Sequence, residues 1–204
     1  TPQLLHFLSN FPDETHPDIC VPGGRSVPCT CTKMGEVMDD LVFDDLEERD
    51  GHFYRKFSDV PFTGKTTGRL QGTFKDGKRD GPWSWFYDNG QLGRKGTFKD
   101  GRQEGPYVSY HDNGQLDSKV SYKDGKMDGP RVSYHENGQL FFKETYKDGK
   151  KHGPWVRYYD NGQLHFKGTY KDGELDGPWE GYHKDGTVDE KWTGTFKNGV
   201  EISD

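Results

Sequence analysis

"GPWVRYYDNGQLHFKGTYKDGELD", residues 153–176, is the stretch that decides the fold. It holds two runs typical of β-strands, residues 155–159 and 163–171, on either side of Asn161-Gly162. Asn-Gly between two such runs is the strongest short-range signal for a two-residue hairpin turn. A second turn signal follows at Asp172-Gly173. The stretch therefore predicts two antiparallel strands and the turn into a third.

The same pattern recurs along the chain. Gly-Pro pairs begin at positions 81, 105, 129, 153 and 177, which are 24 residues apart, and Asp-Gly turns keep the same spacing. A fixed period of about 20 to 50 residues indicates a repeat architecture. We therefore predict an all-β fold, an elongated single-layer antiparallel β-meander built from 24-residue hairpin repeats, with a short irregular or partly helical N-terminal extension.

The repeats divide the chain into two expected regions. Residues 1–50 form an N-terminal extension with a cysteine loop, which we interpret as a docking segment or a cap, and Pro2 with the following leucines suggests a short helix in it. Residues 51–204 form the repeat sheet, with a degenerate first unit at about 52–75 and regular units at about 76–193. Asn198-Gly199 follows the last regular turn by 26 residues, so the C-terminal end is atypical.

Composition limits both the core and the partners. Hydrophobic residues make up 29% of the chain, aromatic residues 14%, and Gly occurs 28 times, so a thin sheet held by contacts between strands is expected. The net charge of −6 and the absence of a Lys/Arg stripe argue against nucleic acid. Because no run of 18 apolar residues occurs, no membrane-spanning helix is expected.

Three cysteines, Cys20, Cys29 and Cys31, lie in a segment rich in Pro and Gly. They are disulfide candidates in an oxidising compartment, and the alternative is three reduced thiols. The chain starts without Met and without a signal peptide, which we interpret as a removed leader or a trimmed start. We therefore expect a secreted, periplasmic or cell-surface protein.

Alternation along the strands assigns side chains to two faces. Val108, Val132 and Val156 share a face with Phe86 and Tyr110 and its equivalents. We expect the leucines of the Gln-Leu pairs, together with Phe98, Tyr122, Tyr146 and Tyr170, to join them on one apolar face. The other face is then expected to carry the tryptophans, with Lys95, Thr97, Lys167 and Thr169 between them.

Neither metal binding nor catalysis is indicated by the repeats. His111, His135 and His183 share one slot, but equivalent strands lie about 9–10 Å apart, too far for two histidines to share a zinc ion. The acidic residues before each Asn-Gly favour the turn. No catalytic motif occurs, so we expect a protein that is not an enzyme and has no metal and no cofactor.

Residues 72–199 resemble the MORN-variant repeat family. The resemblance is carried by G-x-W-x-x-Y-Y-x-N-G-Q-L at 153–164 and by K-G-x-Y-K-D-G at 167–173, and Arg131 departs from it because the aromatic residue is missing. The chain is also similar to proteins labelled antitoxins of the YwqK type. The resemblance implies a meandering antiparallel sheet and a role in protein association.

The strand before each Asn-Gly turn is the expected binding region, because Trp and Tyr dominate interface energetics. A protein partner or self-assembly is our first hypothesis. Glycan or cell-wall binding is the alternative, and an antitoxin or immunity role comes third. The predicted partner-binding residues are Trp83, Trp85, Tyr87, Tyr107, His111, His135, Trp155, Arg157, Tyr159, Trp179 and His183.

Overall fold

The computed structural model describes residues 41–202. The expected N-terminal helix and the cysteine loop with Cys20, Cys29 and Cys31 lie outside these residues, so both stay predictions. Within residues 41–202 the helical elements are two short 3-10 turns, η1 (Phe43–Asp45) and η2 (Glu190–Trp192). None of the described helices has the length and hydropathy needed to cross a membrane.

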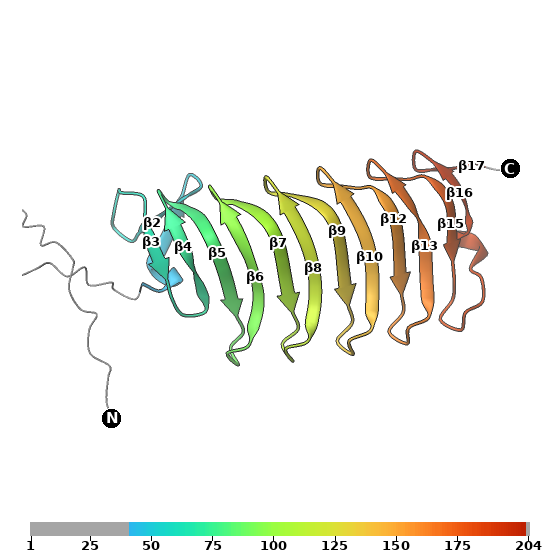
Figure 1. Cartoon of the computed structure of the whole chain (residues 1–204), viewed down its shortest axis with the longest axis horizontal. Helices are drawn as coiled ribbons and strands as arrows, with labels where there is room; N and C mark the ends of the chain where they lie inside the picture. The colour runs from blue at the N-terminus through green and yellow to red at the C-terminus, as the bar shows by residue number, and fades with distance from the viewer. Residues whose placement is uncertain (1–40, 203–204) are drawn as a thin grey trace, which may run out of the picture. The chain divides into compact units, whose positions relative to one another are not determined.

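One antiparallel sheet of 15 strands holds most of the described chain, and its strand order follows the sequence (Figure 1). This arrangement confirms the predicted meander. The short strands β11 and β14 pair with β10 and β13 just ahead of β12 and β15. The strands are β3 (Gly64–Thr66), β4 (Leu70–Lys75), β5 (Lys78–Phe86), β6 (Leu92–Lys99), β7 (Arg102–Tyr110), β8 (Leu116–Lys123), β9 (Lys126–Tyr134), β10 (Leu140–Lys147), β11 (Lys150–Lys151), β12 (Gly153–Tyr158), β13 (Leu164–Lys171), β14 (Glu174–Leu175), β15 (Gly177–Gly181), β16 (Gly194–Lys197) and β17 (Val200–Ile202).

The Asp-Gly pairs make the two-residue turns of the sheet. At Asp100 and Gly101 both φ angles are positive, 49° and 82°, as a type I′ turn requires. Aspartate tolerates this left-handed conformation better than most side chains, and glycine adopts it without steric cost. The same pair of angles recurs in every Asp-Gly turn and at Asn198-Gly199.

The Asn-Gly turns are longer than predicted. The Tyr159 carbonyl accepts a hydrogen bond from the Gly162 N–H at 3.0 Å, and the Tyr159 N–H donates to the Gln163 carbonyl at 2.8 Å. Gly162 has a φ of 81°, whereas Asn161 is not among the residues with positive φ. The loop therefore has three residues, a common hairpin form in which a type I turn is followed by a left-handed glycine. The two-residue prediction is wrong here.

Each long hairpin also contains a bulge directly after this loop. In β12 and β13, Tyr158 is opposite Leu164 and Arg157 is opposite Phe166, so His165 is an extra residue. An extra residue reverses the alternation of side chains along the strand. Leu164 and Tyr170 therefore lie on opposite faces, and the prediction that they share one is wrong. Gly93, Asp117 and Phe141 occupy the equivalent bulge positions in the earlier hairpins.

The two faces of the sheet are defined by the strand register. Trp83 is opposite Gly96, whereas the next residue, Ser84, is opposite Lys95. Lys95 and Thr97 therefore lie on the other face from the tryptophans, contrary to the prediction. The aromatic face carries Phe74, Trp83, Trp85, Phe98, Tyr107, Tyr122, Tyr146, Trp155, Phe166, Tyr170 and Trp179. The Val/Lys face carries Val108, Val132 and Val156, Lys95, Lys119, Lys143 and Lys167, Tyr110, Tyr134 and Tyr158, and the strand prolines.

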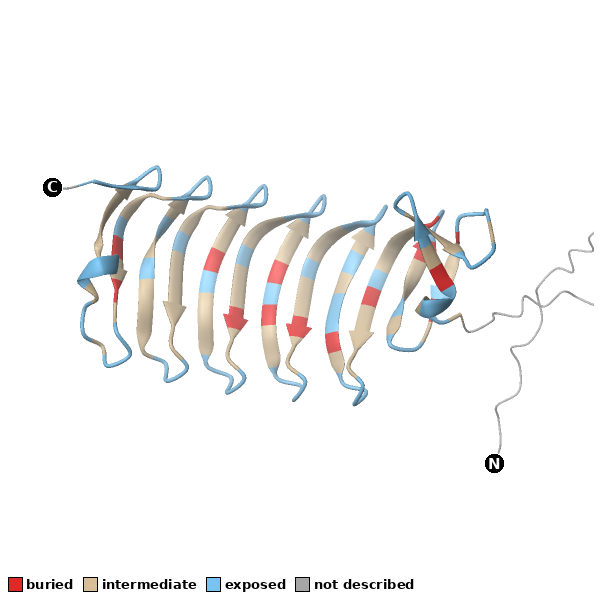
Figure 2. Cartoon of the chain, turned by 180° about the vertical axis from the view of Figure 1, so that it is seen from behind, coloured by how far each residue is buried: buried red, intermediate tan, exposed pale blue. Residues whose placement is uncertain are grey.

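Few residues are fully buried, as the composition predicts, and they are scattered along the strands (Figure 2). The main hydrophobic cluster lies at the N-terminal end of the sheet, where the hairpin of β1 (Leu46–Arg49) and β2 (His52–Arg55) contributes Leu46 and Phe53. Phe74 is completely buried there, with its ring centroid 4.9 Å from that of Trp83. The expected boundary at residue 50 falls in the turn of this hairpin.

The C-terminal end of the sheet consists of two short strands. β16 pairs with β15, and Trp192 of the preceding 3-10 turn packs edge-on against Phe166. β17 is the last strand, with Val200 66% and Ile202 47% exposed. A strand of only three residues limits unwanted edge-to-edge pairing.

Candidate functional site

A continuous row of residues runs through the middle of the Val/Lys face from β5 to β15. Each residue of the row is opposite the next in the strand register, and valine alternates with lysine over most of its length. The row is Ser84, Lys95, Val108, Lys119, Val132, Lys143, Val156, Lys167 and Glu180. Because lysine recurs on every second strand, the lysine positions are about 9.5 Å apart.

Two further rows flank the valines and lysines. On one side tyrosine alternates with leucine, as in Tyr110 opposite Leu116 and Tyr134 opposite Leu140. On the other side proline alternates with a hydroxyl residue, as in Pro130 opposite Thr145. A proline inside a strand is tolerated at a bulge, and each of these prolines follows a glycine with positive φ. The rows together give a face with an apolar floor and regularly placed polar groups.

The Val/Lys face is hollowed over β9 to β15. A groove of about 760 Å³ lies there, and its floor includes Val132, Tyr134 and Val156, with Lys143 and Lys167 beside them. The valines and tyrosines are half-buried by their neighbours in the sheet, and the lysines are exposed. This groove is therefore open to a ligand along its whole length.

The lysines of the row differ in their ion pairs. Among residues 41–202, no carboxylate oxygen lies within 4 Å of the ammonium groups of Lys95, Lys119 or Lys143. Lys167 pairs with Glu180 at 2.9 Å, and this hydrogen bond raises the pKa of Lys167. The uncompensated positive charge of the row therefore lies between β6 and β10.

The sequence-predicted binding residues all come from the strands and loops before the Asn-Gly turns, but two of them are buried. Trp83 is 5% and Trp179 is 7% exposed. Their indole N–H groups donate to the carbonyls of Thr73 and Thr169, at 3.2 and 3.1 Å. The expectation that these two rings are exposed is wrong, because each lies over a glycine of the preceding strand.

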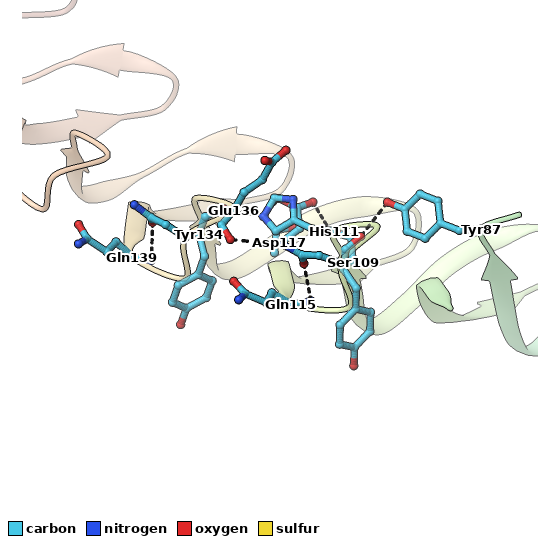
Figure 3. A network of polar contacts seen from close by, with 12 residues as sticks. Tyr87, Ser109, His111, Gln115, Asp117, Tyr134, Glu136 and Gln139 are labelled. Carbon is cyan, nitrogen blue, oxygen red and sulfur yellow. Dashed lines mark hydrogen bonds and ion pairs between the residues drawn. The ribbon is translucent and has the colours of Figure 1, made fainter. Parts of the chain in front are cut away.

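Four other predicted residues form a ladder between repeats (Figure 3). The Tyr87 hydroxyl donates to the Tyr110 carbonyl at 2.8 Å, and His111 Nε2 donates to the Tyr134 carbonyl at 3.1 Å. His135 and Tyr159 make the same bond to the next unit, at 3.2 and 3.0 Å. The polar atoms of these side chains therefore hold neighbouring units together, which explains why both Tyr and His occupy this slot.

The remaining predicted residues keep some free surface. Trp85, Tyr107, Trp155 and Arg157 are half-buried, and Arg157 lies over the Phe141 ring with its guanidinium carbon 4.8 Å from the centroid. The His183 side chain is 56% exposed and lies 3.8 Å from Asp189. Their role in binding stays a prediction.

The third unit, where Arg131 replaces the aromatic residue, has a polar network on the aromatic face. The Glu144 carboxylate is 3% exposed and lies 3.0 Å from both the Arg131 guanidinium and the Lys151 ammonium. The Tyr146 hydroxyl donates to it at 3.1 Å, and burial, with the nearby Glu144 charge, raises the pKa of that hydroxyl. The buried carboxylate is thus fully paired, and it stabilises this unit in place of an aromatic contact.

A serine, a histidine and an aspartate do meet in the second unit, although sequence analysis found no such group (Figure 3). The Ser109 hydroxyl donates to Asp117 at 2.7 Å, and His111 Nε2 lies 3.9 Å from the same carboxylate. A nucleophilic serine requires a hydrogen bond to its general base, and here the serine bonds the acid instead. Residues 41–202 contain no cluster of metal-ligating side chains.

Comparison with known proteins supports the repeat interpretation. The family model described as MORN repeat variant matches residues 79–100, 103–124, 127–148 and 151–172. These four matches confirm the resemblance at the level of the repeats, and they point to a repeat-based binding or structural module. They do not extend to antitoxins of the YwqK type. No curated protein matches the chain.

Solved structures show only remote likeness. A mutant of TarM from S. aureus is 11% identical over 44% of this chain and 18% of its own, with a TM-score of 0.29. The accessory secretory protein 1, 2 and 3 structure from Streptococcus pneumoniae is 18% identical over 58% of this chain and 21% of its own, also with a TM-score of 0.29. The chain thus spans about a fifth of their length, and values this low carry no argument about function.

Proposed function

We propose that this protein is a non-catalytic binding module and that its Val/Lys face contacts a protein partner. The observation that carries this proposal is the row of half-buried valines and exposed, unpaired lysines in strict register across β6 to β10. The valines and tyrosines supply apolar area, and the lysines favour a partner with negative charge at matching positions.

The partner is a different chain rather than a second copy. Two Val/Lys faces laid against each other would bring lysine rows together, and like charges across an interface disfavour association. The aromatic face is the weaker candidate, because Trp83, Trp179 and the ladder from Tyr87 to Tyr159 already make contacts inside the sheet. The secreted or cell-surface location expected from the sequence remains part of this proposal.

The experiment is a pull-down from the native source with three forms of the full chain. One is unchanged, one carries Lys119→Glu and Lys143→Glu, and one carries Lys56→Glu and Lys191→Glu. The last is a matched control, since both of its lysines are exposed, lie outside the Val/Lys row and give the same change in net charge. Mass spectrometry then identifies proteins bound by each form.

We expect a protein that the unchanged chain and the control retain and that the Lys119/Lys143 variant loses. Equal retention by both variants would place the contact elsewhere and contradict the proposal. Far-UV circular dichroism on all three forms shows whether the sheet is intact. Because the four positions are exposed, none of the substitutions is expected to unfold it.

Glycan binding is a second candidate, supported by the half-buried rings Trp85, Tyr107 and Trp155 on the aromatic face. Affinity electrophoresis in polysaccharide gels tests it, with Trp85→Ala as the variant because Trp85 lies outside the buried cluster. Retardation that Trp85→Ala abolishes and Lys119→Glu leaves unchanged would favour a glycan on the aromatic face.

A further inference from the structure

We infer that the Val/Lys face binds an acidic segment in the polyproline II conformation, with a carboxylate at every third residue. This inference rests on the proposed function and names the chemistry of the partner segment. It is carried by the match between two periods, one in the sheet and one in the ligand.

The period of the sheet is fixed by its strands. Lys95, Lys119 and Lys143 lie in one register row, and a single valine strand separates each lysine from the next. Two strand spacings amount to about 9.5 Å. The tyrosine row and the proline row beside the lysines repeat with the same period, because every unit contributes one residue to each.

A polyproline II helix has three residues per turn and rises about 3.1 Å per residue, so every third side chain points the same way about 9.3 Å further along. An extended strand repeats every two residues, about 6.6 Å, and misses the lysines. An α-helix returns to the same face after seven residues, about 10.5 Å, and drifts by about 1 Å per lysine. The polyproline II period fits the row best.

The surface around the lysines fits such a segment chemically. Polyproline II ligands dock in grooves lined by aromatic side chains and lose little entropy because they are preformed. The hollow over β9 to β15 has Tyr134, Val132 and Val156 in its floor, and the Lys95 ammonium lies over the Tyr110 ring, 6.0 Å from its centroid. Prolines of the segment would contact these residues, and its carboxylates would pair with the lysines.

The structure also sets the length of the recognised motif. Glu180 pairs with Lys167 at 2.9 Å and closes the row at its C-terminal end. Three lysines remain for the ligand, so the motif has three acidic residues at positions i, i+3 and i+6. A fourth acidic residue in the same spacing meets Lys167 only if it displaces Glu180.

The test measures fluorescence anisotropy of capped, labelled peptides with the full chain at low and at moderate salt. The first peptide repeats Glu-Pro-Pro, the second repeats Glu-Pro-Pro-Pro with the same number of glutamates, and the third repeats Lys-Pro-Pro. A heparin oligosaccharide of comparable charge serves as an anion without this spacing. We expect the Glu-Pro-Pro peptide to bind at least fivefold more tightly than each of the other ligands.

Two variants locate the site. Lys119→Glu with Lys143→Glu should weaken the Glu-Pro-Pro peptide at least tenfold, and the Lys56→Glu, Lys191→Glu control should leave its affinity unchanged. Glu180→Gln frees Lys167, so a peptide with four glutamates should then gain over one with three, a gain that the unchanged chain does not give. Equal binding of the two acidic spacings, equal binding of heparin, or no binding of any peptide would overturn the inference. The pull-down above tests the proposed function independently of these peptides.

Discussion

Glycines opposite the tryptophans make room for the rings on the aromatic face. A Cβ atom built on Gly168 would lie 2.2 Å from the Trp179 ring, and one on Gly72 would lie 2.1 Å from the Trp83 ring. Such distances are far inside van der Waals contact, so only glycine fits beneath these rings. In the unit with Arg131 the equivalent position is Val120, because no ring covers it. The residue that fills the position depends on the ring that lies above it.

The first prediction concerns Gly168. We expect Gly168→Ala to lower the free energy of unfolding by about 1–3 kcal/mol, because the Trp179 ring is held by its bond to Thr169 and cannot move aside without losing it. Urea denaturation measures the change. In a Trp179→Ala background the same substitution should cost almost nothing. A full cost in that background would contradict the overlap.

The second prediction concerns pH. Tyr122, Tyr146 and Tyr170 lie on the aromatic face, and burial raises the pKa of each above its ordinary value. The unfolded chain releases these protons near pH 10, whereas the folded chain holds them to higher pH. Stability should therefore be independent of these groups below about pH 10 and fall as pH rises through the raised values. Urea titrations between pH 8 and 11 should show a shallower loss for Tyr170→Phe, and an unchanged slope would contradict this.

At the scale of the element, the Asn-Gly loops are linked to one another along the sheet. Asn89, Asn113, Asn137 and Asn161 each accept the N–H of the glutamine two residues on, and each donates to a carbonyl in the next loop. In the last unit Asp185 takes this slot and accepts from Thr187 at 2.9 Å. An aspartate keeps the acceptor and lacks the donor, which suits a unit that no further Asn-Gly loop follows among residues 41–202.

The third prediction separates these two roles. Asn137→Asp keeps the bond to Gln139 and removes the donor to the Asp160 carbonyl, a bond of 2.7 Å. We expect it to lower the free energy of unfolding by about 0.5–1.5 kcal/mol, the usual net value of one hydrogen bond. Asn137→Ala should cost more, since it removes both bonds. If the two variants were equally stable, the contact between loops would have no energetic role.

Sequence analysis predicted the strands, the turns and their order, because Gly, Pro and the turn pairs recur at a fixed period. It did not predict the bulges, since Gly93, Asp117, Phe141 and His165 have no side-chain property in common. One missed residue per hairpin was enough to place Phe98 and its equivalents on the wrong face. A Gly-Pro pair inside a strand pattern was the available signal that this sheet contains bulges.

At the scale of the whole repeat array, each unit contacts only its neighbours, so the stability of the sheet is roughly a sum over units. The lysine row belongs to this scale as well. The sequence shows no basic stripe, because Lys95, Lys119 and Lys143 are 24 residues apart along the chain. Only the strand register brings them into one row, and the binding surface therefore becomes visible only in the folded sheet.

The fourth prediction tests the independence of the units. Deleting residues 125–148 joins Asp124 to Gly149 and keeps both the Asp-Gly turn and the register on either side. We expect a folded sheet with a lower urea midpoint. Deleting only 125–147 leaves one extra residue and shifts every following side chain to the other face, so that variant should not fold cooperatively. Circular dichroism during urea titration distinguishes them, and similar behaviour of both would contradict the independence of the units.

The most direct measurement of the central claim is NMR of the chain with ¹³C-dimethylated lysines, which keep their charge, titrated with the Glu-Pro-Pro peptide. If the Val/Lys face is the binding surface, the methyl signals of Lys95, Lys119 and Lys143 move most, and those of Lys56, Lys184 and Lys191 stay in place. If the signals of all exposed lysines move alike, or if the row does not respond, the account is contradicted.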